Sequence, residues 1–161
     1  MIVNRVTAVL RIAGAALLAA LVVTGCASAG GATPSIHVAS AYVPQPTTPG
    51  TTVAYLEIRN NGPADKLVSA QTSVGGKVQL RAPAGRHSGA LTMRTVPDIP
   101  IAANAMTRFN PISYHLLITG AGSMRDGKDI MLRLTFASAG TITVIAMVTN
   151  PQSGGSSYFL N

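Results

Sequence analysis

Imidazole and thioether groups are the side chains of this sequence best suited to chemistry. The histidines are His37, His87 and His115, and beyond Met1 the methionines are Met93, Met106, Met124, Met131 and Met147. Together these two groups favour a soft ion such as Cu(I), because thioether sulfur is a poor ligand for hard cations. The first expectation is therefore a soft-metal site, with copper in its reduced state as the cofactor.

Methionine has a competing structural role, because its flexible side chain commonly fills gaps in a core. Met106, Met131 and Met147 fall within apolar strand patterns, and that position predicts burial. His115 lies between Tyr114 and an apolar run, a setting that is typical of a half-buried structural histidine. His37 is expected to be structural or exposed.

Enzymatic chemistry finds little support in the sequence. The chain has five carboxylates, none of them paired as a general acid and base. It also lacks a serine nucleophile elbow, a phosphate-binding glycine loop and a closely spaced His-Glu-His set. Basic residues are spread thinly, without interleaved aromatics, which argues against nucleic acid as a partner. We expect a protein that is not an enzyme.

The amino-terminal segment has the pattern of a bacterial lipoprotein leader. Arg5 and Arg11 precede an uncharged apolar stretch over residues 12–23, and Val-Thr-Gly then leads into Cys26. The stretch is short for a membrane span, which needs about 20 residues, but suits a secretory leader. The four residues 23–26 resemble a lipobox. We expect cleavage after residue 25, lipid such as palmitate on Cys26, and anchoring at the extracytoplasmic face of the cell membrane.

This assignment limits how the mature chain is stabilised and what it contacts. Cys26 is the only cysteine, so its lipidation leaves none for a disulfide. Loss of the leader removes two arginines and lowers the net charge from +7 to +5. A mildly basic domain held at a membrane sits favourably near anionic headgroups.

The remaining chain divides into a tether, one domain and a tail. Small and polar residues over 26–35 predict a flexible tether, residues 36–149 predict the domain, and residues 150–161 predict a flexible tail. Short β-rich runs separated by turn residues favour an all-β sandwich or barrel, here of eight or nine strands.

Particular turns and strands follow from local pattern. Residues 53–59 alternate with period two and end at the turn sequence Asn-Asn-Gly-Pro. Gly75-Gly76 joins the runs 66–74 and 78–80, and suggests a hairpin between them. Ser-Ala-Gly at 138–140 predicts a tight connection between the last two runs.

Several segments in order resemble the PCu(A)C-type periplasmic copper chaperones, over about residues 36–148. The segments are Thr-Val-Ala-Tyr-Leu at 52–56, Asn-Asn-Gly at 60–62, Asp-Lys-Leu-Val-Ser-Ala at 65–70, Ser-Tyr-His-Leu-Leu at 113–117 and Leu-Arg-Leu-Thr-Phe at 132–136. The resemblance implies a cupredoxin-like, immunoglobulin-like β-sandwich. It also implies a partner in the envelope that gives or accepts copper.

The resemblance further implies a copper site of two histidines and two methionines, of which this chain keeps half. Met93 matches the first methionine, and His115 follows 22 positions later, at the family spacing. Arg81 stands where the first histidine is expected, and Leu117 where the final methionine is expected. Protonated arginine and leucine have no lone pair for a metal.

Two other residues are candidates to complete the site. His87, in a predicted loop at 83–89, would replace the lost histidine, and Met124, in a loop after Gly122, would replace the lost methionine. Two functional hypotheses follow. The chain binds or delivers Cu(I) through Met93 and His115, or it is a lipoprotein of the same fold that has lost copper and serves as an interaction or scaffold module in the envelope.

Overall fold

The described part of the chain is a β-sheet domain. The structure is a computed structural model that describes residues 33–150 and residue 152. The leader 1–25, Cys26, most of the predicted tether and most of the predicted tail lie outside the described residues. No helix in the described part has the length and apolar character needed to cross a membrane.

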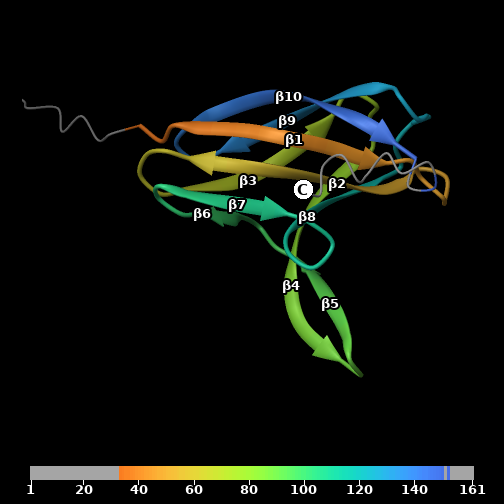
Figure 1. Cartoon of the computed structure of the whole chain (residues 1–161), viewed down its shortest axis with the longest axis horizontal. Helices are drawn as coiled ribbons and strands as arrows, with labels where there is room; N and C mark the ends of the chain where they lie inside the picture. Colours follow the sequence, from red (N-terminus) through yellow and green to blue (C-terminus); the bar gives the residue numbers. More distant parts are fainter. Residues whose placement is uncertain (1–32, 151, 153–161) are drawn as a thin grey trace, which may run out of the picture. The chain divides into compact units, whose positions relative to one another are not determined.

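Ten strands make up this domain (Figure 1). They are β1 (Ile36–Pro44), β2 (Thr51–Asn60), β3 (Asp65–Thr72), β4 (Lys77–His87), β5 (Ala90–Thr95), β6 (Ile99–Ile101), β7 (Ala105–Phe109), β8 (His115–Thr119), β9 (Asp129–Phe136) and β10 (Gly140–Thr149). The all-β prediction is confirmed, with ten strands in place of eight or nine. The unpredicted β6 carries Pro100 at its centre and lies at a sheet edge, where proline is tolerated.

The strands are joined in the order β5-β4-β8-β2-β1-β10-β9-β3-β6, with β7 added beside β2. Along one side, strand β2 pairs with β8 near its start and with β7 near its end. The first and last strands pair in parallel, with Tyr42 opposite Met147. The remaining ladders are antiparallel.

Alternation along the strands creates the core. In β2 every second side chain is buried, including Ala54, Leu56 and Ile58, while Tyr55 between them is half-buried on the opposite face. Leu132 and Leu134 of β9 are fully buried in the same core cluster. Each buried Leu or Ile among them contributes about 1.5–3 kcal/mol of hydrophobic stabilisation.

Gly75-Gly76 does not close the hairpin that its sequence suggests. Strand β3 pairs with β6 and β9, whereas β4 pairs with β5 and β8. The turn therefore connects two strands that do not pair with each other and share no partner strand. Gly76 has a φ of +79°, and a Cβ there would lie 2.5 Å from the Thr119 carbonyl oxygen. Gly76 is therefore explained by a tight crossing against the end of β8, and Gly75 by its φ of +74°, a conformation that favours glycine.

The closing hairpin, in contrast, follows its prediction. Gly140 pairs with Phe136 across the turn at 137–139, and the β9–β10 ladder continues to Met147 opposite Asp129. Buried Asp65 fastens this turn to β3, because its carboxylate accepts hydrogen bonds from the backbone N–H groups of Ser138 and Ala139, each at 2.9 Å.

Candidate metal centre

His115 begins strand β8, which lies between β2 and β4. Leu116 and Ile118 point into the core and are completely buried. His115 and Leu117 are half-buried on the other face, because successive side chains of a strand point to opposite sides. Leu117 therefore shares the face of His115, as a ligand at that position would.

Met93 reaches the same face through the ladders of β4. Arg81 pairs with His115 on one side and with Thr95 on the other, and Pro83 pairs with Met93. Directly paired residues and residues two apart share a face. The structure thus brings both predicted ligands, Met93 and His115, to one face of the sheet, here named the Met93 face.

Arg81 lies between the two ligands on this face. Met93 and His115 are separated by two strand spacings and a two-residue step, which puts their Cα atoms about 12 Å apart in a regular sheet. A metal shared by both side chains would lie above β4, next to Arg81. Arg81, which stands where the resemblance implies a histidine, is therefore at the centre of this candidate site.

The guanidinium of Arg81 is held by β5. Its Nη1 donates to Thr95 Oγ1 and its Nη2 donates to the Met93 carbonyl oxygen, both at 2.8 Å. Its Nε is buried and has no hydrogen-bond partner within the described part of the chain. These bonds fix a positive charge beside the backbone of the proposed methionine ligand.

His115 is poised to remain neutral. Burial lowers the pKa of its imidazole, the charge of Arg81 lowers it further, and the Ser113 backbone acts in the opposite direction. Although that backbone is near, Nδ1 is buried and makes no hydrogen bond of good geometry to any described residue. The Tyr55 ring packs edge-on against the imidazole, with 6.3 Å between ring centroids. A neutral imidazole keeps one nitrogen lone pair, which a metal requires.

His87 does not lie near this centre. It is exposed at the end of β4, which continues through the predicted loop at 83–89 as a strand. It lies six positions beyond Arg81, or about 20 Å along an extended strand. The β4–β5 hairpin carries His87 away from His115 (Figure 1). The prediction of a loop here is wrong, because the strand continues past a bulge between Pro83 and Gly85.

Met124 lies in the core at the other end of β8. Although it lies in a loop, its side chain is only 5% exposed. His115 begins β8 and Met124 follows its end, so the length of the strand, about 13 Å, lies between them. The loop is drawn inward by the hydrogen bond from Gly122 N to the Val74 carbonyl oxygen.

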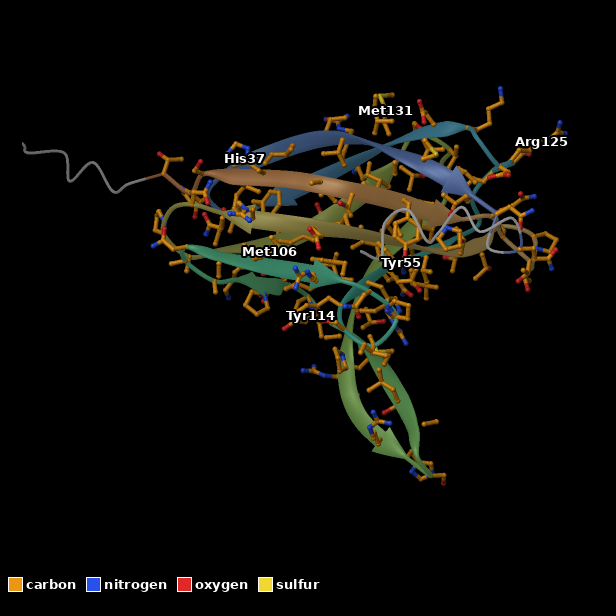
Figure 2. All side chains as sticks on the ribbon, viewed as in Figure 1. His37, Tyr55, Met106, Tyr114, Arg125 and Met131 are labelled. Carbon is orange, nitrogen blue, oxygen red and sulfur yellow. The ribbon has the colours of Figure 1, made fainter. Side chains whose placement is uncertain are left out.

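The three strand methionines are exposed, which corrects the prediction that they fill the core. Met106, Met131 and Met147 are 37%, 52% and 46% exposed. Each occupies an outward position of its strand, and in β9 the neighbours Ile130 and Leu132 take the inward ones. Figure 2 shows Met131 pointing away from the sheet. His37 is exposed, which agrees with one of its two expected roles.

The resemblance already placed the charge of Arg81 at this site, but the wider positive charge of the Met93 face was not predicted. Lys77 and Arg81 share this face of β4, and β4, β5 and β8 contain no carboxylate. The signal was present in the sequence, since no Asp or Glu occurs between Asp65 and Asp98. No group of three or more His, Cys, Asp or Glu in the described residues is arranged to hold a metal.

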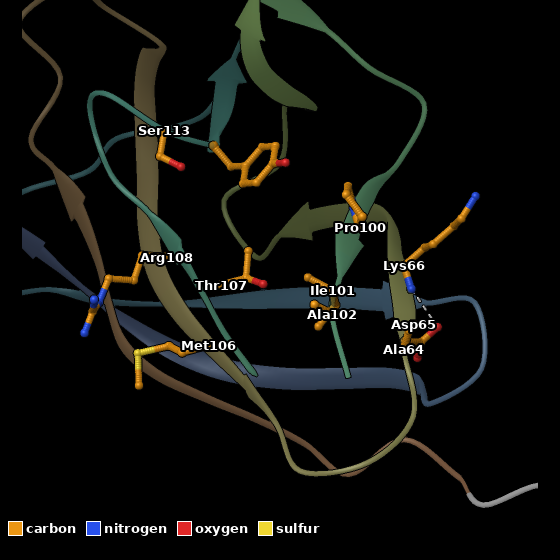
Figure 3. A pocket seen from close by; sticks show the side chains of 11 residues that line it. Ala64, Asp65, Lys66, Pro100, Ile101, Ala102, Met106, Thr107, Arg108 and Ser113 are labelled. Atoms are coloured by element: carbon orange, nitrogen blue, oxygen red, sulfur yellow. Dashed lines mark hydrogen bonds between the residues drawn. The ribbon is translucent and has the colours of Figure 1, made fainter. Parts of the chain in front are cut away.

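A separate hollow of about 640 Å³ lies over β3, β6 and β7 (Figure 3). Its rim carries Lys66, which pairs with Asp98 at 3.5 Å, and Arg108, which pairs with Glu57 at 2.8 Å. Tyr114 lines the hollow and packs on Phe109, with 5.9 Å between ring centroids. Its lining does not include Met93 or His115.

Solved structures identify the class of fold. The copper-bound PCuAC domain from PmoF2 matches with a TM-score of 0.61 at 16% identity, over 74% of this chain and 96% of that one. The apo PCuAC domain from PmoF1 gives 0.62 at 18% identity, over 74% and 97%. The apo PmoF2 domain gives 0.59 at 18% identity, over 74% and 95%. The domain thus has the fold of PCuAC domains, a cupredoxin-like and immunoglobulin-like β-sandwich, as the resemblance implied.

The family follows from the sequence. A family model described as "Putative lipoprotein LpqE-like" matches residues 36–148, which cover nearly all of the described domain. The chain belongs to the LpqE-like family. A search of curated proteins found no match to it.

Proposed function

We propose that this chain is a lipoprotein anchored through Cys26 at the extracytoplasmic face of the cell membrane, whose domain binds Cu(I) through Met93 and His115 and exchanges it with another envelope protein. The observation that carries this proposal is the shared sheet face of Met93 and His115. The half-buried imidazole of His115, whose lowered pKa keeps it neutral, also supports copper binding. The fold it shares with PCuAC domains, one of them copper-bound, adds support.

The affinity expected of this site is modest. Met93 and His115 provide two donors, and the fixed charge of Arg81 repels a cation placed above β4. Both the missing donors and the repulsion favour rapid release. A weak site suits transfer of copper to a partner with more ligands.

A Cu(I) titration of the purified, detergent-solubilised lipoprotein against a competing chelator tests this function. Met93→Ala and His115→Ala should each weaken binding at least tenfold, about 1.4 kcal/mol. Met131→Ala removes an exposed thioether from another strand and should leave binding unchanged. Equal binding by the wild type and the Met93→Ala/His115→Ala double variant would refute the proposal.

A second function is favoured by one observation, the pairing of Arg81 with His115 in place of a second ligand. Here the domain has lost copper and acts as an interaction module in the envelope. Crosslinking in intact envelopes should then recover a specific protein partner. Its yield should fall in Arg81→Gln and should be the same with and without a copper chelator.

The anchor has its own test. Cys26→Ser should abolish incorporation of a palmitate analogue and release the protein from the membrane fraction. Cys26 is the only thiol of the chain, so any label on the variant would have to be attached elsewhere. Label of undiminished strength on Cys26→Ser would refute the proposed site of acylation.

A further inference from the structure

The β4–β5 hairpin carries positive charge without any negative charge. Its two strands and their turn contain Lys77, Arg81, Arg86 and Arg94, and no Asp or Glu. Lys77, Arg86 and Arg94 are exposed. In a chain with only twelve Lys and Arg residues, this concentration on one hairpin marks it as the place where an acidic group would be attracted.

The outer half of the hairpin contacts little besides itself. Residues 83–87 and Ala90 are all exposed, and the ribbon extends away from the rest of the sheet (Figure 1). A Cβ added to Gly85 or Gly89 would meet no atom within 4 Å. Local bonds hold its shape, including Arg86 Nη1 to the Gly89 carbonyl oxygen at 3.0 Å. A two-stranded hairpin is only marginally stable in water without further packing, so added contacts would order it.

Strand β5 also offers a free edge. Within the described part of the chain it pairs only with β4, and it ends the strand order of the sheet. An edge strand exposes a row of backbone N–H and C=O groups. In β5 the Met93 carbonyl oxygen already accepts a bond from Arg81 Nη2, so an added strand would use the other groups of the edge. An extended peptide can add to such an edge through backbone hydrogen bonds, while its alternate side chains determine specificity.

Charge and register define the side chains that such a peptide would meet. Arg86 pairs with Leu91, so it shares the face of Met93, two residues further along β5, and Arg81 lies on the same face. Arg94 pairs with Ala82 and points to the opposite face. A peptide strand that pairs with β5 would therefore lie near cationic side chains on both faces of the sheet.

A second copy of this chain fits poorly as that partner. The chain has five carboxylates. Glu57 pairs with Arg108, Asp98 pairs with Lys66, and Asp126 accepts a hydrogen bond from Asn150 N. Asp65 is buried and bound by backbone N–H groups. Four of the five carboxylates are thus engaged within the chain. A phospholipid headgroup is also a poor partner, because it has no peptide backbone to pair with the N–H and C=O groups of the β5 edge.

We propose that the free edge of β5, with the cationic side chains of the β4–β5 hairpin, binds an acidic, extended segment of another envelope protein by strand addition. This inference extends the interaction module proposed above, because it names the surface and the chemistry of the partner. It holds whether or not copper is bound.

Site-specific photo-crosslinking in intact cells tests it. The full-length lipoprotein carries benzoyl-phenylalanine at Ala90 on the β5 edge or, as a control, at exposed Thr143 on β10. Crosslinked peptides are identified by mass spectrometry. We expect Ala90 to crosslink to one protein segment rich in Asp and Glu, and Thr143 not to do so.

Charge-matched variants show whether the hairpin is responsible. Arg86→Gln/Arg94→Gln removes two exposed charges that lie beside β5, one on each face of the hairpin, and should lower the crosslinking yield at Ala90 at least tenfold. Arg125→Gln/Arg133→Gln removes the same charge elsewhere and should leave the yield within twofold. A copper chelator should change neither result.

Several outcomes would overturn the inference: crosslinks at Ala90 to phospholipid, to a second copy of the chain or to a segment without acidic residues, equal loss in both charge variants, or no crosslink at Ala90. If general crosslinking still recovers a partner but Ala90 does not contact it, the interaction module stands and this surface is wrong. If Ala90 crosslinks as expected and the copper titration fails, only the copper function is lost.

Discussion

Arg81 and His115 lie directly opposite each other in the β4–β8 ladder, so a permanent positive charge faces the candidate histidine ligand. Burial lowers the pKa of the His115 imidazole, and the charge of Arg81 lowers it further and opposes a bound cation.

Removal of the Arg81 charge should raise the pKa of His115. Burial will still hold that pKa below its ordinary value near 6.5. The folded chain binds this proton less readily than the unfolded chain, so stability should fall as the pH drops below about 6.5, and less steeply in Arg81→Gln. NMR titration of the imidazole protons measures the change, with Arg133→Gln as the control. An unmoved pKa in Arg81→Gln would show that burial alone is responsible.

Restoring the two missing donors should convert the face into a stronger copper site. Arg81→His places an imidazole opposite His115, and Leu117→Met places a thioether two residues along the same face. The double variant also loses the repelling charge, so Cu(I) affinity should rise at least tenfold, about 1.4 kcal/mol. A chelator competition measures the gain. Unchanged affinity would argue that the face cannot hold four converging ligands.

The methionines should differ sharply in their contribution to stability. Met124→Ala should lower the free energy of unfolding by about 2–5 kcal/mol, because it opens a cavity in the core. Met131→Ala, at an exposed strand position, should change it by about 0.5 kcal/mol or less. Urea unfolding of both variants measures the difference. Similar values would contradict the burial of Met124.

Asp65 should stabilise the domain in a pH-dependent way. Burial alone would raise the pKa of its carboxyl, but the backbone N–H groups of Ala139, Lys66 and Ser138 outweigh it and lower the pKa. Asp65→Ala leaves three donors without an acceptor and should cost about 1–3 kcal/mol at pH 7.

This stabilisation is present above the ordinary aspartate pKa, near 3.9, and is lost as the pH falls through the lower value of the folded state. The difference between the wild type and Asp65→Ala should therefore shrink below about pH 4. Urea unfolding at pH 7 and pH 3 measures it, with exposed Asp129→Ala as the control. A difference that stays constant with pH would contradict the hydrogen bonds to the ionised carboxylate.

Sequence pattern predicted the strands better than their partners. The alternation in residues 53–59 and the turn at 138–140 define β2 and the β9–β10 hairpin, because both depend on local spacing. Gly75-Gly76 has the composition of a hairpin turn, but its neighbours pair with distant strands. Those pairings depend on the burial of both faces of the whole sheet, which no local window contains.

The candidate site was predictable in its residue types and only partly in its geometry. The resemblance to copper chaperones implied that Met93 and His115 share one site, and the ladders bring them to one face. That Arg81 pairs with His115, and that Met124 is buried, depend on register and loop path. The methionine orientations were mispredicted because an apolar run shows that a strand is apolar, not which of its side chains point inward.

The parallel pairing of β1 with β10 has a consequence for how the chain folds. This ladder pairs Tyr42 with Met147, so about two-thirds of the chain lies between the two paired segments. Contacts between such distant segments slow folding, because the chain loses much conformational entropy before these contacts form and stabilise it. A nascent or truncated polypeptide that ends before β10 would leave β1 and β9 with open edges, the geometry from which aggregates grow. The domain is therefore protected from aggregation only once β10 has been synthesised and has paired, and not when any single hairpin forms.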